Sequence, residues 1–373
     1  MDILNQIVEC KENNSTDEFL FIENKDKKQW YINKFYMSKA FEIYQPTSKN
    51  GKLIKVLLPV FKNLKIIHRL LGLQEKRITL ISPIYNSIQN YFKDSDIHFS
   101  FFGGTPSVHQ KVVVQIYNKD RILAYCKISG STEVGKLFDK ECEILEYLQK
   151  CKIDNVPKLI FRKNVDQYQL FCQSSVKNKN YKVNTKFGKI HFRFLMDMYE
   201  KSKCRLQFRD SVYEKMLDDL NSNIGSFEKK DQLVLNKAIK IIRKLYEKKV
   251  IEVSMFHGDF TPWNMICELD QLKVFDFEYA QKFYPPLLDA YHFCLQTELF
   301  VNTNFDPVKV YENIKKRLIE CKFPYKFEIG MIMYLLHIIY FYTVRSKKEN
   351  KEEMERQKIR LLILKETVKI YEN

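Results

Sequence analysis

Residues 257–278 read HGDFTPWNMICELDQLKVFDFE. Two apolar stretches in this segment, 265–269 and 272–277, lie on either side of a short polar turn. Short apolar runs joined by a tight turn predict a β-hairpin. Polar residues stand just before the first strand and at the end of the second, so the hairpin would bring them together.

Two of these polar residues are suited to bind a metal ion. If the hairpin loop takes three residues, 269–271, Asn264 faces Asp276 across the open end. Mg²⁺ prefers carboxylate and amide oxygens and completes its shell with water and substrate phosphates. We therefore expect Asn264 and Asp276 to bind Mg²⁺.

Asp259 lies five residues before Asn264, on the turn that precedes the hairpin. There its carboxylate could accept a proton from an attacking hydroxyl group. The alternative is that each acidic residue is only a solvated turn residue. That alternative would explain a single Asp, but here it would have to explain three features together: His-x-Asp, the Asn five residues after that Asp, and Asp-Phe-Glu after the hairpin. The combination favours phosphoryl transfer. His257 belongs to the same catalytic group, where we expect it to orient the loop through a backbone hydrogen bond rather than act as the base.

At these residues the sequence resembles the aminoglycoside phosphotransferase and choline kinase superfamily, which is related to protein kinases. The resemblance covers roughly residues 96–300, and its most specific parts are residues 257–264 and 276–278. It implies that ATP and Mg²⁺ are used, that Asp259 is the catalytic Asp and that the metal ligands are those named above. Asp289, in the sequence PPLLD, resembles a later Asp of the family that braces the catalytic loop, with an ordinary surface Asp as the alternative.

The resemblance also implies the fold. We expect an α+β class and a bilobal, protein-kinase-like fold, preceded by an N-terminal α/β extension. Residues 1–95 form that extension, whose role the sequence does not reveal. Residues 96–176 form a small nucleotide-binding lobe with an antiparallel sheet and one helix, and residues 177–373 form a larger, mainly helical lobe with the catalytic loop and the acceptor site.

The residue pattern of residues 96–176 supports a small lobe with strands and one helix. A helix is predicted over 133–150, where apolar residues recur at helical spacing. Short apolar runs separated by polar turns predict five strands around it. These strands are 98–102, 112–117, 122–128, 157–161 and 168–172.

Lys127 and Glu141 are the predicted ion pair of this lobe. A kinase-type site needs a strand Lys that reaches the nucleotide phosphates and a helix Glu that holds it. Glu141 falls on the apolar stripe of the predicted helix, whereas Glu143 and Glu146 do not. A carboxylate on a buried face is costly unless a cation pairs with it, and Lys127 on the adjacent strand is that cation. Extension of Glu141 to solvent is the alternative.

The nucleotide-covering loop is expected at Gly103, Gly104, Thr105 and Ser107, which offer a flexible turn, N–H groups and hydroxyls. The segment lacks the spaced glycines of protein kinases, so a plain hairpin turn is the alternative. Adenine is expected against the linker that begins near Gln173.

Beyond the linker the pattern predicts helices around 208–221, 228–248, 307–320, 326–343 and 350–371. The most apolar run, Gly330 to Thr343, has 14 residues, fewer than the ~20 needed to cross a bilayer. We therefore expect a buried helix and no transmembrane segment, with peripheral membrane contact left open.

The chain is strongly basic, with 62 Lys and Arg against 46 Asp and Glu and a net charge of +16. Residues 177–193 are the best candidate for a nucleic-acid surface or else a solvated insertion. Because the lysines are spread along the whole chain, we expect no specific nucleic-acid binding but an attraction for anionic ligands such as nucleotides. Nine unpatterned cysteines and an N-terminus unlike a signal peptide indicate the cytoplasm.

The function expected from these features is an ATP- and Mg²⁺-dependent kinase that phosphorylates a hydroxyl of a small molecule. No Ala-Pro-Glu segment follows Asp276, which disfavours protein substrates. The acceptor is left open among a sugar or surface-glycan intermediate, an aminoglycoside and choline. A catalytically inactive, kinase-like binding or scaffold protein is the alternative.

Overall fold

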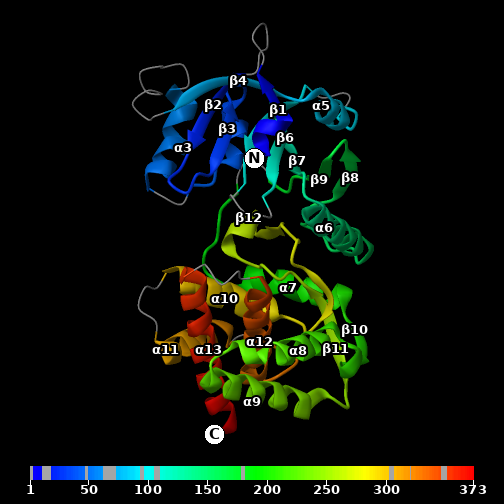
Figure 1. Cartoon of the computed structure of the whole chain (residues 1–373), viewed down its shortest axis with the longest axis vertical. Helices are drawn as coiled ribbons and strands as arrows, with labels where there is room; N and C mark the ends of the chain where they lie inside the picture. The colour runs from blue at the N-terminus through cyan, green and yellow to red at the C-terminus, as the bar shows by residue number, and fades with distance from the viewer. Residues whose placement is uncertain are drawn as a thin grey trace. The chain divides into compact units, whose positions relative to one another are not determined.

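The computed structural model describes residues 3–10, 18–46, 49–61, 73–92, 96–104, 110–177, 181–301, 306–319, 321–345 and 351–373. They belong to two compact units, which Figure 1 shows with their labelled elements. The first unit comprises residues 1–146 and 157–180, and the second comprises residues 147–156 and 181–373. The predicted α+β class is confirmed, with an antiparallel sheet in the first unit and mainly helices in the second.

The first unit contains a nine-stranded antiparallel sheet, counted over the described residues, in the order β1-β4-β2-β3-β5-β6-β7-β9-β8. Its strands are β1 (Val8–Cys10), β2 (Glu18–Glu23), β3 (Gln29–Asn33), β4 (Gln74–Leu80), β5 (His98–Phe102), β6 (Val112–Tyr117), β7 (Ile122–Ser129), β8 (Leu159–Val165) and β9 (Tyr168–Ser174). The five strands expected in the small lobe are all present. Strand β8 begins two residues later than predicted and extends further, to Val165.

The N-terminal region is part of this sheet. Strands β1–β4 come from residues 8–80, and β3 pairs with β5, where Trp30 lies opposite Phe102. The expected boundary near residue 95 therefore does not coincide with the division into compact units. The helices of this unit are α1 (Leu4–Ile7), α2 (Met37–Ala40), the 3-10 helix η1 (Phe41–Ile43), α3 (Lys49–Phe61), α5 (Ser82–Gln89) and most of α6 (Thr132–Lys150).

Both faces of the central strands are mostly buried, which explains why β6 and β7 are rich in Val and Ile. Val112, Val114 and Ile116 belong to a core that includes α1 and α5 residues, while Val113 packs against a second core that includes residues of α2 and η1. On this second side Nε2 of Gln115 donates to the backbone oxygen of Lys39 at 2.8 Å.

The second unit is mostly helical. Its helices are α7 (Lys189–Ser202), α8 (Val212–Ser222), α9 (Lys229–Tyr246), α10 (Leu288–Val301), α11 (Pro307–Leu318), α12 (Phe327–Arg345) and α13 (Lys351–Glu372), with the 3-10 turns η2 (Phe208–Asp210), η3 (Ile224–Ser226) and η4 (Pro262–Asn264). Strands β10 (Cys204–Gln207), β11 (Val250–Phe256) and β14 (Gln281–Tyr284) form a small sheet, and β12 (Met265–Glu268) and β13 (Gln271–Val274) form a hairpin.

Three predictions for this unit were incomplete. Residues 189–193 begin helix α7, which buries His191, Phe194 and Leu195, so the end of the 177–193 segment is part of the core and is not a solvated insertion. Helix α10 was not predicted because nearly all its residues are buried and no amphipathic pattern marks it. Helix α8 starts later than predicted because Ser211 caps it, accepting the N–H of Glu214 at 3.0 Å.

The apolar run becomes helix α12, which contacts α8, α9, α10 and α13. Among the described residues it is the one helix long and apolar enough to cross a membrane, and 61% of its apolar window is buried inside the structure. This burial is what a core helix shows.

Candidate active site

The candidate catalytic loop, residues 257–264, begins where strand β11 ends. This strand is held between β10 and β14, and its residues Val253, Met255 and Phe256 are buried, so the position of His257 after it is firmly set. Gly258 then turns the chain with φ 82°, and a Cβ at this position would lie 2.5 Å from the carbonyl oxygen of Tyr279. Only glycine fits both the torsion and the space.

Asp289 holds this turn from the start of helix α10. One of its carboxylate oxygens accepts the N–H of His257 at 2.8 Å and the other accepts the N–H of Gly258 at 3.0 Å. Asp289 is 1% exposed, which excludes the surface alternative. Burial raises the pKa of Asp289 to about 7, although the two N–H donors act in the opposite direction.

His257 connects the loop to the end of the hairpin. Its Nδ1 accepts the N–H of Asp259 at 3.2 Å, so the proton of a neutral ring is on Nε2, which donates to the carbonyl oxygen of Phe275 at 3.1 Å. Burial lowers the pKa of His257 to about 4, against the attraction of Asp259. Since both ring nitrogens are engaged with backbone, this geometry gives His257 an orienting role.

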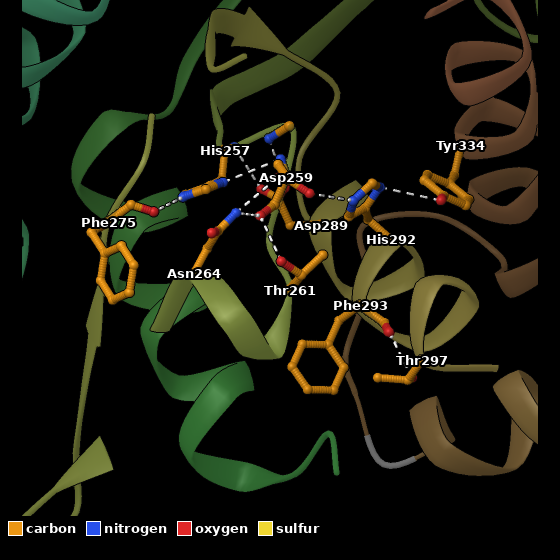
Figure 2. A network of polar contacts seen from close by, with 11 residues as sticks. His257, Asp259, Thr261, Asn264, Phe275, Asp289, His292, Phe293, Thr297 and Tyr334 are labelled. Atoms are coloured by element: carbon orange, nitrogen blue, oxygen red, sulfur yellow. Dashed lines mark hydrogen bonds and ion pairs between the residues drawn. The ribbon is translucent and has the colours of Figure 1, made fainter. Parts of the chain in front are cut away.

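Asn264 fixes the side chain of Asp259, as Figure 2 shows. Its Nδ2 donates to the Asp259 carboxylate at 2.7 Å and to the Asp259 carbonyl oxygen at 3.0 Å. The Asp259 side chain stays 30% exposed. Asp259 is therefore a fixed carboxylate that a solvent-borne hydroxyl can still reach.

The hairpin forms, but its register differs from the prediction by one residue. Met265 pairs with Val274 and Glu268 with Gln271, so the loop has two residues, Leu269 and Asp270. Both have positive φ, 47° and 59°, as a type I′ hairpin turn requires. Asn264 consequently faces Phe275, whose N–H donates to the Asn264 carbonyl oxygen at 3.0 Å, and the predicted facing of Asn264 and Asp276 is wrong.

Asp276 nevertheless lies close to the loop. It follows Phe275 and has φ 70°. Its carboxylate, like that of Asp259, favours the protonated form of His257 and so opposes part of the effect of burial on the pKa of His257. Within the described residues, no group of three or more His, Cys, Asp or Glu is arranged to hold a metal ion.

The residues nevertheless fit a Mg²⁺ bound partly by substrate phosphates. Both Nδ2 bonds of Asn264 point to Asp259, and its amide oxygen accepts no hydrogen bond from the described part of the chain. That oxygen and the Asp276 carboxylate are the ligand types Mg²⁺ takes, and one or two protein ligands are usual when phosphates supply the rest.

Two residues of this site were missed by sequence reasoning, His292 on α10 and Tyr334 on α12. Nε2 of His292 lies 3.3 Å from a carboxylate oxygen of Asp259, and its Nδ1 lies 3.3 Å from the Tyr334 hydroxyl. The only signal in the sequence is that His292 follows Asp289 by three residues on one helix, which places both on one face.

In the first unit the predicted pair of Lys127 and Glu141 is present. Nζ of Lys127 lies 2.9 and 2.8 Å from the two carboxylate oxygens of Glu141. Lys127 is 5% exposed and Glu141 is 0% exposed, so Glu141 does not extend to solvent. Strand β7 and the buried face of α6 fix both side chains.

Gln173 shares one face of the sheet with Lys127. Strands β7 and β9 pair Lys127 with Phe171 and Tyr125 with Gln173, and directly opposite residues of an antiparallel pair project to the same side. Gln173 is part of strand β9 and not of the linker. It is 5% exposed, and its side-chain oxygen is buried without a hydrogen-bond partner among the described residues.

The predicted nucleotide-covering loop is only partly described. Thr105 and Ser107 lie outside the described residues. The N–H of Gly103 donates to the carbonyl oxygen of Gln29, on strand β3, at 2.8 Å. This N–H group is therefore already hydrogen-bonded within the protein. Gly104 has φ 78°, and a Cβ there would collide with the backbone of Lys111.

Comparisons with known proteins give structural similarities only. No protein-family model matches the chain, and no curated protein matches it. The solved aminoglycoside phosphotransferase APH(2'')-Ib with ADP is 13% identical, with a TM-score of 0.45, and the match covers 77% of this chain and 98% of that one. The choline kinase LicA from Streptococcus pneumoniae is 12% identical, with a TM-score of 0.46 and coverage of 75% and 97%.

Proposed function

We propose that this protein is a small-molecule kinase that transfers the γ-phosphoryl group of ATP to a hydroxyl group. The proposal rests on the position and the exposure of the Asp259 side chain. Its carboxylate is held by Asn264 in a loop that Asp289 braces, yet 30% of the side chain is exposed. A fixed and accessible carboxylate of this kind is what a base for an alcohol requires.

The transfer step assigns a role to each residue. The acceptor oxygen attacks the γ-phosphorus as the bond from that phosphorus to the β,γ-bridging oxygen breaks, and ADP leaves with the electron pair. The hydroxyl proton passes to Asp259. Lys127, held by Glu141, neutralises phosphate charge, and Asn264 and Asp276 would hold Mg²⁺, which supplies further charge neutralisation when bound.

The buried side-chain oxygen of Gln173 supports an adenine nucleotide as the phosphate donor. An acceptor that is buried without a partner costs free energy unless a ligand satisfies it, and the exocyclic amine of adenine is a suitable donor. Gln173 and Lys127 share one face of the sheet, which allows one nucleotide to use both. ATP is therefore the proposed phosphate donor.

A sugar-type acceptor is supported by two exposed aromatic rings. Trp263, next to Asn264, is 49% exposed and Phe300 is 67% exposed, with ring centroids 5.9 Å apart. The C–H face of a sugar can pack against such rings while its hydroxyls stay solvated or reach the base. The net charge of +16 disfavours cationic acceptors such as aminoglycosides and choline at long range.

The test uses the full chain with radiolabelled ATP and Mg²⁺ and a panel of monosaccharides, glycan precursors, choline and aminoglycosides. We expect label in a neutral or anionic sugar and none with Asp259→Asn. If ATP binds but neither an acceptor nor water receives phosphate in an Asp259-dependent manner, the inactive scaffold is the correct alternative.

A further inference from the structure

A buried His–Tyr pair lies beside Asp259 and has no part in the transfer step described above. His292 is 2% exposed and Tyr334 is 0% exposed. The His292 ring lies between the Asp259 carboxylate and the Tyr334 hydroxyl, 3.3 Å from each. Figure 2 shows the three side chains in a row that runs from helix α12 to the catalytic loop.

We infer that His292, held by Tyr334, is a positioning residue that fixes the Asp259 carboxylate in the orientation needed to accept the acceptor's proton. The inference rests on the proposed function, because it assigns Asp259 the role of base. It adds His292 on α10 and Tyr334 on α12 to a site that already includes the loop, the hairpin and Asp289 of α10.

The direction of the hydrogen bonds follows from Asp259. A carboxylate only accepts hydrogen bonds, so Nε2 of His292, which lies 3.3 Å from it, carries the proton and donates. In a neutral imidazole Nδ1 then has no proton and accepts, so the Tyr334 hydroxyl donates to it at 3.3 Å. Both bonds therefore require the Nε2–H tautomer of His292.

Asp259 is then held by donors from two different elements. Asn264 on η4 donates to one carboxylate oxygen at 2.7 Å, and His292 on α10 donates to the other at 3.3 Å. Two donors on two oxygens fix the plane of the carboxylate, which one donor would leave free to rotate. The remaining lone pairs are available to the acceptor hydroxyl.

Helix α10 combines this role with that of Asp289. Asp289 and His292 are three residues apart on the same helix, and the first holds the backbone of the loop while the second holds the side chain of the base. A base and its loop attached to one helix keep their relative position, and misplacement by about 1 Å can cost about 10²-fold in rate.

Three variants test the inference. His292→Leu removes the donor, and we expect kcat to fall about 10²-fold with the KM for ATP unchanged. His292→Gln offers an amide that can donate to Asp259 and accept from Tyr334, and it should recover a large part of kcat. Tyr334→Phe frees the tautomer of His292 without touching Asp259, and we expect a fall of about 10-fold, as for other supporting hydrogen bonds.

The chain provides a matched control. Tyr284 and His337 form a second buried His–Tyr pair, with the hydroxyl 2.7 Å from Nδ1 of the ring, and neither contacts Asp259. Tyr284→Phe therefore removes an equivalent hydroxyl, and we expect kcat to stay within twofold of the wild type. Equal losses in Tyr284→Phe and Tyr334→Phe would show a general packing effect and overturn the inference.

A measurement without turnover separates this inference from the proposed function. In protein labelled with ¹⁵N-histidine, the two ring nitrogens of His292 should report the Nε2–H tautomer, and Asp259→Asn should shift its Nε2–H signal. The Nδ1–H tautomer, or no response to Asp259→Asn, would overturn the inference even if the enzyme is active. If no acceptor is phosphorylated but these NMR results hold, the contact stands and the proposed function fails.

Discussion

Gly258 donates its backbone N–H to a carboxylate oxygen of Asp289 at 3.0 Å while its own φ is 82°. Asp289 also accepts the N–H of His257 at 2.8 Å, so the left-handed turn at Gly258 directly follows two backbone groups that helix α10 holds in place. The glycine is therefore a requirement of the catalytic loop and not a flexible spacer.

Gly258→Ala should distort the loop. A non-glycine residue in this region of φ costs about 1–2 kcal/mol, and the added Cβ would also meet the backbone of Tyr279. We expect a lower melting temperature and loss of most ATP-dependent phosphate transfer. Gly225→Ala is the matched control, because nothing lies within 4 Å of a Cβ there, and an equal loss in both variants would contradict the explanation.

Variants of Lys127 and Glu141 should distinguish the contribution of this pair to stability from its contribution to nucleotide binding. Lys127→Met leaves Glu141 buried without its cation, which typically costs 3–5 kcal/mol. The double variant Lys127→Met/Glu141→Leu replaces the pair with apolar groups, so urea unfolding should show most of that stability regained. Calorimetric ATP binding should remain weak in both. Recovered ATP affinity in the double variant would remove Lys127 from the phosphate site.

Much of the fold was predictable from local patterns, as β6, β7 and α6 illustrate. Their apolar residues recur with strand or helix spacing, and the position of Glu141 on the apolar stripe was enough to predict its pairing with Lys127. Local patterns fail where burial is nearly complete, and this is why α10 was missed although it supports the active site.

The errors at the site have equally specific causes. The hairpin register depended on whether the loop had two or three residues, and the pairing of Glu268 with Gln271 and the positive φ values of Leu269 and Asp270 decide this. His292 and Tyr334 lie on two different helices and are 42 residues apart in the sequence, and no spacing in the sequence encodes their contact.

His191 should make the protein sensitive to acid. Burial lowers the pKa of His191 to about 4, whereas the unfolded chain titrates near 6.5. The unfolded state therefore binds more protons between these values, and the stability from His191 is present above pH ~6.5 and lost as the pH falls through 4, by up to about 3 kcal/mol.

His191→Gln isolates this effect. Gln can still accept the N–H of Gly188, which lies 3.1 Å from Nδ1 in the wild type, but it does not titrate. The wild type should be more stable than the variant at pH 7, and urea unfolding should show this advantage shrinking by pH 4.5. The comparison with the variant is needed because two other buried groups also make the stability depend on pH. His257, whose pKa is lowered, destabilises the protein in acid as His191 does, whereas Asp289, whose pKa is raised, acts in the opposite direction. An advantage independent of pH would contradict the prediction.

Asp276→Asn should weaken the metal site. The change keeps the size of the side chain and removes a charge that Mg²⁺ attracts. We expect the Mg²⁺ concentration for half-maximal activity to rise at least tenfold. Asp270→Asn in the turn of the same hairpin is the control, since Asn also tolerates its positive φ of 59°. Unchanged Mg²⁺ dependence in Asp276→Asn would exclude it as a ligand.

The aromatic pair of Trp263 and Phe300 should determine how the acceptor binds. Both rings are exposed and in contact with one another, so replacing one removes little from the core but half of the packing surface for a sugar. Trp263→Ala and Phe300→Ala should each raise the acceptor KM about 10-fold, as the loss of one aromatic contact does, and leave the KM for ATP unchanged. Leu233→Ala, at a 72% exposed apolar side chain on α9, controls for general surface effects. A rise in the KM for ATP, or a fall in kcat at saturating acceptor with KM unchanged, would mean that these rings serve the nucleotide or the loop and would leave the acceptor site elsewhere on the second unit.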